Sequence, residues 1–201
     1  MITIDGANTN LRIENFANLE EILVRASSDS RLDNRIVTDV LLNDEVFSEL
    51  YPHQAEDIAA DAISSVEIRS VPFGEMALNI AGELYKVNEI MSGGSRQVAR
   101  LFREGENEEA LELFQDLLDV TRDFISMVGV LRSEFTLGEA GAFSANVEQI
   151  SGLLGEMSEV LESEDWILLA DLLEYELIPA SENWKQIIQS LRETIRQNQR
   201  A

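Results

Sequence analysis

The chain has 201 residues, no cysteine and a formal net charge of −23. The absence of cysteine excludes a disulfide scaffold, a thiol nucleophile and every zinc site built on cysteine, and a hydrophobic content of 45% argues against intrinsic disorder. Because so negative a surface repels phosphate backbones and anionic lipid, we expect neither nucleic-acid binding nor membrane-surface binding.

The first 71 residues carry mixed signals. Alternating or β-branched segments predict strands at residues 1–5, 11–16, 35–42, 46–50 and 66–71. The order of these elements and the helices among them is compatible with a small split βαβ sandwich, which is one of several arrangements that fit.

Local capping and turn signals separate these strands. Asn18 opens a helix, because an Asn side chain caps the free amide groups of a first turn and the acidic residues that follow it suit the helix dipole. Asn43-Asp44 is a plausible hairpin turn. Pro52 can start a short helix that runs through Ala62.

From Pro72 onward the apolar residues recur at intervals of three and four, which is typical of amphipathic helices. The pattern predicts helices over residues 73–104, 107–135, 142–163 and 165–197, with Asn107 and Asp165 as caps and a turn at 137–141. The stretch Ser92-Gly93-Gly94-Ser95 predicts a break or kink, since two glycines cost a helix interior roughly 2 kcal/mol.

Pro179 falls within the last helical pattern. The apolar period keeps its phase on both sides of this proline, which favours one helix that kinks there over two helices that meet. The predicted fold is therefore α+β. A small α+β domain (1–71) precedes a mostly antiparallel bundle of four or five long helices (72–201).

No constellation of residues indicates chemistry. His53 is the single histidine, and it follows Pro52 without a second group at a metal-ligand spacing. No Glu-x-x-His pair supports a dimetal centre, and the acid-rich segments 29–33 and 104–109 lack the order of a calcium loop. We therefore assign no catalytic, cofactor-binding or metal-ligating residue, expect no cofactor, and predict that the protein is not an enzyme.

Three aromatic residues of the last helix stand nine residues apart. A nine-residue step turns a straight helix by about 180°, so Tyr175 would oppose Trp166 and Trp184. We expect the two tryptophans in the core and Tyr175 at its boundary. The alternative is that one of the three anchors a partner.

Charge is unevenly distributed along the helical half. Residues 100–176 carry nineteen acids and four arginines, whereas the end of the chain is basic through Lys185, Arg192, Arg196 and Arg200. These basic residues suit the end of a helix, and they could also dock on the acidic bundle of the same chain or of a second copy.

The leading hypothesis is a non-catalytic protein-binding adaptor, regulator or chaperone-like factor of unknown partner. A bundle with amphipathic faces can hold a helix in a groove, and an acidic surface favours a basic or exposed helical client. The alternatives are an enzyme that uses an unrecognised pair of carboxylates and a purely structural oligomer, which makes a homo-oligomer possible.

In size, charge and helix pattern, residues 84–197 resemble bacterial secretion chaperones, including the flagellar type that clasps an exported subunit. The resemblance implies a chaperone for export and transfers no functional residue.

The N-terminal sequence MITIDGANTN has no basic segment or apolar run of a secretory signal, and no segment approaches about 20 apolar residues. We therefore expect a soluble cytoplasmic protein with no membrane contact.

Overall fold

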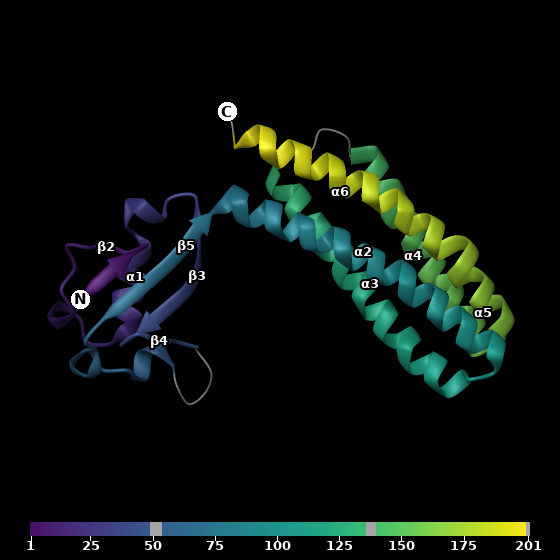
Figure 1. Cartoon of the computed structure of the whole chain (residues 1–201), viewed down its shortest axis with the longest axis horizontal. Coiled ribbons are helices and arrows are strands. Elements are labelled where there is room, and N and C mark those ends of the chain that lie inside the picture. The colour runs from purple at the N-terminus through teal and green to yellow at the C-terminus, as the bar shows by residue number, and fades with distance from the viewer. Residues whose placement is uncertain (49–53, 136–139, 200–201) are drawn as a thin grey trace. The chain divides into compact units, whose positions relative to one another are not determined.

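The computed structural model describes residues 1–48, 54–135 and 140–199 (Figure 1). The chain divides into two compact units, Met1–Met76 and Ala77–Ala201. The first unit contains a five-stranded sheet and the second contains long helices, so the predicted α+β class is confirmed.

The sheet of the N-terminal unit has the strand order β2-β1-β5-β3-β4. Its strands are β1 (Ile2–Ile4), β2 (Ala7–Asn8), β3 (Arg35–Leu42), β4 (Glu45–Val46) and β5 (Val66–Pro72). β5 pairs with β1 in parallel and with β3 in antiparallel register, so β1 and β3 run in opposite directions. The split βαβ arrangement is one of several that fit the sequence. β2 and β3, the strands before and after the first helix in the chain, are parallel and have β1 and β5 between them.

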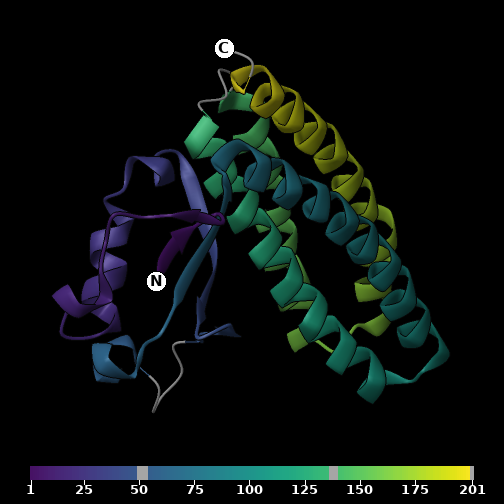
Figure 2. The same cartoon turned by 60° about the vertical axis from the view of Figure 1, so that its left-hand side comes forward.

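Helix α1 (Leu19–Ser27) covers one face of this sheet (Figure 2). The Glu21 amide donates to the Asn18 side chain at 3.0 Å, and the Glu21 carboxylate accepts from the Ala17 amide at 2.8 Å, so the predicted cap is confirmed. The helix buries its apolar face against β1 and β5, and the shared core contains Leu19, Ile22, Ala26, Ile2, Ile4, Val66 and Ile68.

The β3–β4 hairpin turns at Asn43 and Asp44, as predicted. Both residues have left-handed backbone angles, with φ of 53° and 70°, which is the conformation that a tight hairpin turn requires. β4 contains Glu45–Val46. Of the strand predicted at 46–50, Phe47 and Ser48 are not in a strand, and residues 49 and 50 lie outside the described residues.

Two further predictions in this unit are wrong. The segment 11–16 forms a 3₁₀ turn, η1 (Ile13–Asn15), which buries Ile13 in the core. The described part of the segment 52–62 forms two 3₁₀ turns, η3 (Ala55–Asp57) and η4 (Ala60–Ala62), and not one helix. Pro52 and His53 lie outside the described residues.

The reason for the second difference is long-range backbone pairing. The Leu19 amide donates to the Ile58 carbonyl at 2.9 Å, and the Ala60 amide donates to the Ala17 carbonyl at 3.0 Å. These bonds hold Ile58 and Ala59 in extended conformation, which interrupts any helix between the two turns.

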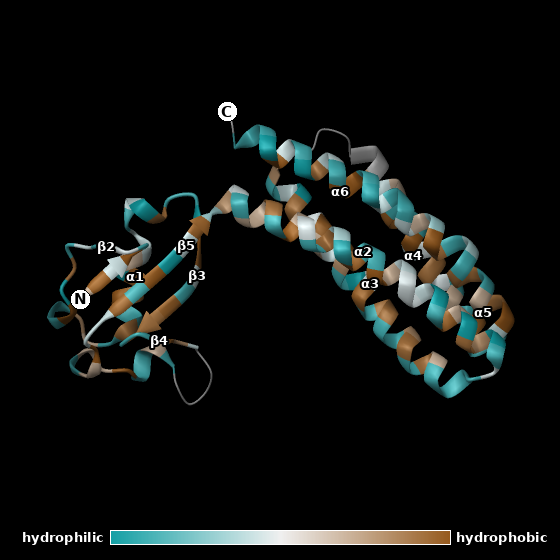
Figure 3. Cartoon of the chain, in the orientation of Figure 1, coloured by the Kyte–Doolittle hydropathy of each residue, from teal (hydrophilic) through white to brown (hydrophobic). Residues whose placement is uncertain are grey.

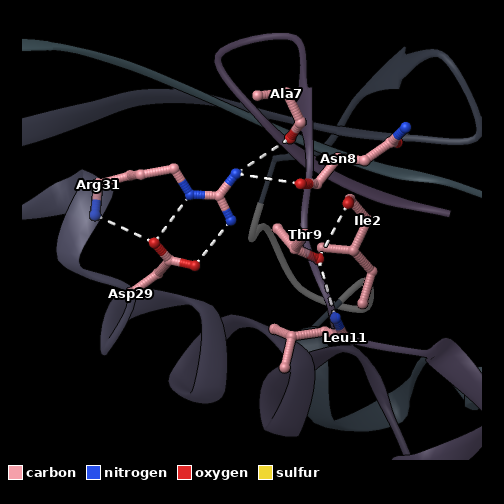
Figure 4. A network of polar contacts seen from close by, with 7 residues as sticks. All are labelled: Ile2, Ala7, Asn8, Thr9, Leu11, Asp29 and Arg31. Atoms are coloured by element: carbon pink, nitrogen blue, oxygen red, sulfur yellow. Dashed lines mark hydrogen bonds and ion pairs between the residues drawn. The ribbon is translucent and has the colours of Figure 1, made fainter.

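The short edge strand β2 is held by a polar network from Arg31 of the 3₁₀ turn η2 (Ser30–Leu32) and from Asp29, which caps this turn (Figure 4). The guanidinium of Arg31 donates to the carboxylate of Asp29 at 2.8 and 2.9 Å and reaches the carbonyl groups of Ala7 and Asn8. These bonds hold the pKa of Asp29 well below its usual range, with the side-chain bond from Arg31 as the largest cause.

The C-terminal unit is an antiparallel bundle (Figure 1). Its helices are α2 (Phe73–Glu104), which begins in the N-terminal unit, α3 (Asn107–Phe135), α4 (Ala140–Glu162), α5 (Trp166–Leu172) and α6 (Ile178–Asn198), with a π-helical segment η5 (Leu173–Leu177) between the last two. Hydrophobic and hydrophilic positions alternate along each helix (Figure 3). Most of the turn predicted at 137–141 lies outside the described residues.

Helix α2 passes through Ser92-Gly93-Gly94-Ser95 as one continuous helix, so a break there is excluded, whereas the alternative of a kink stays a prediction. Ser92 and Ser95 are buried, and their hydroxyl groups donate to the carbonyl groups of Asn88 and Met91, one turn earlier. Gly94 faces α3, where Leu117 lies 3.6 Å from the place a Cβ would occupy. Tertiary packing on both sides of α2 therefore offsets the cost of the glycines.

Helical conformation also continues from Trp166 to Asn198 across Pro179. The π-helical segment η5 ends one residue before Ile178-Pro179, and its wider turn accommodates a proline that has no amide to donate. The preference for one continuous helix over two is confirmed.

The predicted caps differ in outcome. The Asp165 side chain accepts from the Leu168 amide at 3.0 Å, which confirms the cap of α5. Asn107 is the first residue of α3 and not its cap. Its side-chain oxygen accepts no hydrogen bond from a described residue, whereas the Glu106 carbonyl accepts from the Ala110 amide.

Candidate protein-binding groove

An apolar hollow of about 170 Å³ lies between the middle of α2 and the first half of α3. We call this hollow the α2–α3 groove. Its lining is almost entirely apolar, and Asp116 is its one charged residue; the full set is Ile90, Met91, Gly94, Gln97, Val98, Leu113, Asp116, Leu117 and Val120. Small-molecule sites usually enclose roughly 300–1,000 Å³, so the groove has room for a protruding side chain more than for a drug-sized ligand.

The rim of the groove is apolar and exposed. Ile90 is 67% exposed on α2, and Val120 is 38% exposed on α3. Leu113, Val120 and Met127 follow one another at seven-residue steps, so they form one stripe along α3 beside the buried core stripe. Met127, at 43% exposure, extends the apolar surface beyond the hollow.

A row of acids runs along α3 beside this stripe. Its members are separated by three, four, three and four residues, which keeps them on one face of the helix; they are Glu109, Glu112, Asp116, Asp119 and Asp123. All five residues are exposed, and among the described residues only Asp119 has a basic partner, Arg122 at 3.2 Å. We call these five residues the α3 acidic row.

The α2 wall of the groove is uncharged. Its lining residues are Ile90, Met91, Gly94, Gln97 and Val98. Gly93, which is exposed, leaves open space where a side chain would stand. The groove therefore has one acidic wall and one neutral wall.

Behind the groove, α2 is fixed to α6 by buried polar contacts. Asn88 is fully buried and donates to the Ser181 carbonyl at 2.9 Å, while the hydroxyl groups of Ser92 and Ser181 are 2.6 Å apart. Lys185 bridges Glu89 on α2 and Glu182 on its own helix, and the two carboxylates raise the pKa of its ammonium group. Of the basic residues predicted to dock on the bundle, Lys185 does so.

Of the three aromatic residues, Trp184 lies in the core as predicted, whereas Trp166 is only half-buried and Tyr175 is exposed and not at the core boundary. Trp184 is fully buried and meets Phe124 edge to face at 5.4 Å, whereas Tyr175 is 64% exposed. Trp166 is half-buried and stacks on Phe102 at 5.5 Å. Its ring thus closes the end of the bundle between α2 and α5.

The carboxylates do not converge in the core. Among the described residues no aspartate or glutamate is buried, and no group of three or more metal-ligating side chains comes together. In the predicted acid-rich segment 29–33, Asp29 is engaged by Arg31, and in the segment 104–109, Glu104 faces Arg100 at 3.8 Å. These acids therefore act in ion pairs, caps and exposed turns.

A larger hollow of about 540 Å³ lies in the N-terminal unit, beside the network of Arg31. Its lining is mostly polar, and its strongest donor, the Arg31 guanidinium, is already bound to Asp29 and to two backbone carbonyls. The α2–α3 groove has an exposed apolar rim that this hollow lacks.

The prediction from sequence did not find the groove. The sequence predicts an apolar face for the helix at 107–135 that omits Leu113, Val120 and Met127. That face consists of Leu111, Phe114, Leu117, Leu118, Thr121, Phe124, Ile125, Val128, Leu131 and Phe135. The signal that could have found it is this second stripe, because apolar residues at seven-residue steps outside the core face mark a second contact surface.

Family models match both parts of the chain. A domain of unknown function, DUF8042, matches residues 79–187, which include the whole groove, and a second domain of unknown function, DUF8043, matches residues 1–71. No curated protein and no solved structure matches the chain. Within the part of the chain that the structure describes, no helix is long and apolar enough to cross a membrane.

Proposed function

The chain belongs to the DUF8042 family, and on the geometry of its groove we propose that it is a cytoplasmic, non-catalytic protein-binding module. The module holds an amphipathic helix of a basic partner protein in the α2–α3 groove. An adaptor, a regulator and a chaperone-like factor are all forms of this proposal.

The observation that carries the proposal is the exposed apolar rim. Ile90 and Val120 stand on opposite walls of the hollow and expose large apolar side chains that the bundle does not need for its own core. Contiguous exposed apolar surface rimmed by polar residues is typical of a protein-binding site. A helix in such a groove contributes anchors at intervals of three, four and seven residues.

Charge supports a basic partner over a second copy of the chain. The α3 acidic row flanks the groove, and the whole chain has 38 acids against 15 basic residues. Two copies that met through this face would bring like charges together, which is unfavourable, whereas a basic segment would be attracted to it.

The distribution of carboxylates also supports a non-catalytic role. General acid-base catalysis by two carboxylates usually requires a partly buried pair whose pKa values are separated by their surroundings. Every described acid lies outside the bundle core. The side-chain hydrogen bond from Ser70 is the largest cause of the lowered pKa of Asp5, and the side-chain hydrogen bond from Arg31 is the largest cause of the lowered pKa of Asp29. These carboxylates would be unprotonated at neutral pH.

The test is fluorescence anisotropy with a labelled, designed amphipathic peptide of about 18 residues, which is about five helical turns. Its leucines recur every three and four residues, and its remaining positions carry arginine and glutamine. We expect saturable binding that Ile90→Glu weakens about tenfold or more, because burial of an isoleucine side chain contributes roughly 1.5–3 kcal/mol.

Ile167→Glu is the matched control. Ile167 has a comparable exposure of 55% but lies on α5, so this variant introduces the same charge away from the groove and should bind as the natural chain does. Equal binding by the natural chain and Ile90→Glu, or no binding by the natural chain, would contradict the proposal.

A further inference from the structure

We propose, on the premise that the groove binds a helix, that the α3 acidic row fixes the charge pattern and the direction of that helix. The partner helix carries its basic residues on one flank only, at intervals of three and four residues. That flank lies along α3, and the opposite flank, along α2, is neutral.

The acids of the row have the spacing of the flanking side chains on a helix packed alongside. The α3 acidic row runs from Glu109 to Asp123, which is fourteen residues and therefore about 21 Å, or four helical turns. Its members alternate at three and four residues, the same intervals at which a second helix packed alongside presents its flanking side chains. Each turn of the partner helix would thus find one carboxylate.

Most acids of the row are available to pair with basic residues of a partner. Within the described chain, four of the five members have no basic partner, and Asp119 faces Arg122 in an exposed pair that is a weak competitor. Asp116 belongs both to the row and to the lining of the hollow, so the row and the apolar floor form one continuous surface. A partner that fills the floor has its flank beside the row.

The two walls of the groove differ in charge. The α2 wall is lined by uncharged residues, among them Gln97, where the α3 wall presents Asp116 and the rest of the row. Arginines on the α3 side would face carboxylates, whereas arginines on the α2 side would face an uncharged wall. Because reversal of a helix in a groove exchanges its two flanks, only one direction places the arginines beside the row.

The experiment compares two labelled peptides of identical composition. In the one-flank peptide all arginines lie on one side of the leucine stripe and all glutamines on the other. In the split peptide the arginines alternate between the two sides. We expect the one-flank peptide to bind about fivefold or more tightly, and we expect that advantage to shrink as added salt screens the charges.

Two double variants locate the effect. Asp116→Asn/Asp123→Asn removes two charges from the row, and Glu156→Gln/Glu159→Gln removes two from exposed positions on α4. The first variant should abolish the preference for the one-flank peptide and the second should retain it. Equal binding of both peptides to the natural chain, or an unchanged preference in Asp116→Asn/Asp123→Asn, overturns the inference.

The outcome for Ile90→Glu separates this inference from the proposed function. If Ile90→Glu weakens both peptides while the row variant has no effect, the groove binds a helix and the charge pattern is wrong. If Ile90→Glu leaves the affinity for both peptides unchanged, the proposed function fails and the inference fails with it.

Discussion

The hydroxyl groups of Ser92 and Ser181 lie 2.6 Å apart inside the bundle and join the middle of α2 to the start of α6. Each hydroxyl also contacts a backbone carbonyl of its own helix, Asn88 for the first and Ile178 for the second. This contact fixes the helix whose other side forms the floor and one wall of the groove.

The two serines should be energetically coupled. A double-mutant cycle of Ser92→Ala and Ser181→Ala should give a coupling energy of about 0.5–1.5 kcal/mol, the usual net contribution of a hydrogen bond. Urea unfolding followed by tryptophan fluorescence measures it, because both tryptophans belong to the bundle. Strictly additive effects would show that the hydroxyl contact contributes nothing.

Glycine replacement tests why α2 does not break. Gly93→Ala meets nothing within 4 Å, and Gly94→Ala meets Leu117 at an ordinary 3.6 Å. Each variant should raise the free energy of unfolding by about 0.5–1 kcal/mol, because alanine restricts the unfolded chain and favours a helix. A loss of stability in Gly93→Ala would contradict an unstrained, continuous α2.

The N-terminal unit should lose stability in acid. Asp5 accepts from the amide and the hydroxyl of Ser70 at 2.7 Å, and the side-chain bond from Ser70 is the largest cause of its lowered pKa. The side-chain hydrogen bond from Arg31 is the largest cause of the lowered pKa of Asp29. A carboxyl whose folded pKa lies below the usual 3.8 stabilises the fold above that pH, and the contribution is lost as the pH falls through the folded pKa.

Asparagine variants isolate these two groups from the general effect of titrating the other carboxylates. Asp5→Asn and Asp29→Asn should be less stable than the natural chain at neutral pH, and the difference should shrink between about pH 5 and pH 2. Urea titrations followed through the methyl resonances of Ile2 and Ile4 report on this unit. A difference that stays constant with pH would contradict the assignment.

The two tryptophans should differ in their optical properties. Trp184 is fully buried, so the Trp166→Phe variant should emit at short wavelength and resist quenching by acrylamide. Trp166 is half-buried and stacked on Phe102, so Trp184→Phe should emit at longer wavelength and be quenched more readily. The reverse order would place the wrong ring in the core.

Features coded by neighbouring residues could be predicted from the sequence. The strand 35–42 agrees with β3 at both ends, because β-branched residues and the Asn43-Asp44 turn define it locally. The caps at Asn18 and Asp165 also agree, since each depends on one side chain and an amide three residues away.

Features that depend on residues far apart in the chain could not be predicted from the sequence. Residues 55–62 form two turns because the backbone of this segment hydrogen-bonds to the backbone of Ala17 and Leu19. No local pattern of residues encodes that pairing. The glycines of α2 predict a break, and no local pattern encodes that Leu117 of α3 lies beside Gly94 or that Ser181 of α6 contacts Ser92. The groove depends on which apolar residues the core leaves out, and only the assembled bundle decides this for Ile90 and Val120.

A fluorescent label in the α2–α3 groove reports whether the groove receives a helix. The chain has no cysteine, so Val120→Cys carries one environment-sensitive fluorophore, and Gln186→Cys places the same fluorophore on the exposed face of α6. We predict that the one-flank peptide shifts the emission of the Val120→Cys conjugate to shorter wavelength in a saturable way, while the Gln186→Cys conjugate does not respond. An equal response at both positions, or none at Val120→Cys, would contradict the binding of a helix in the α2–α3 groove.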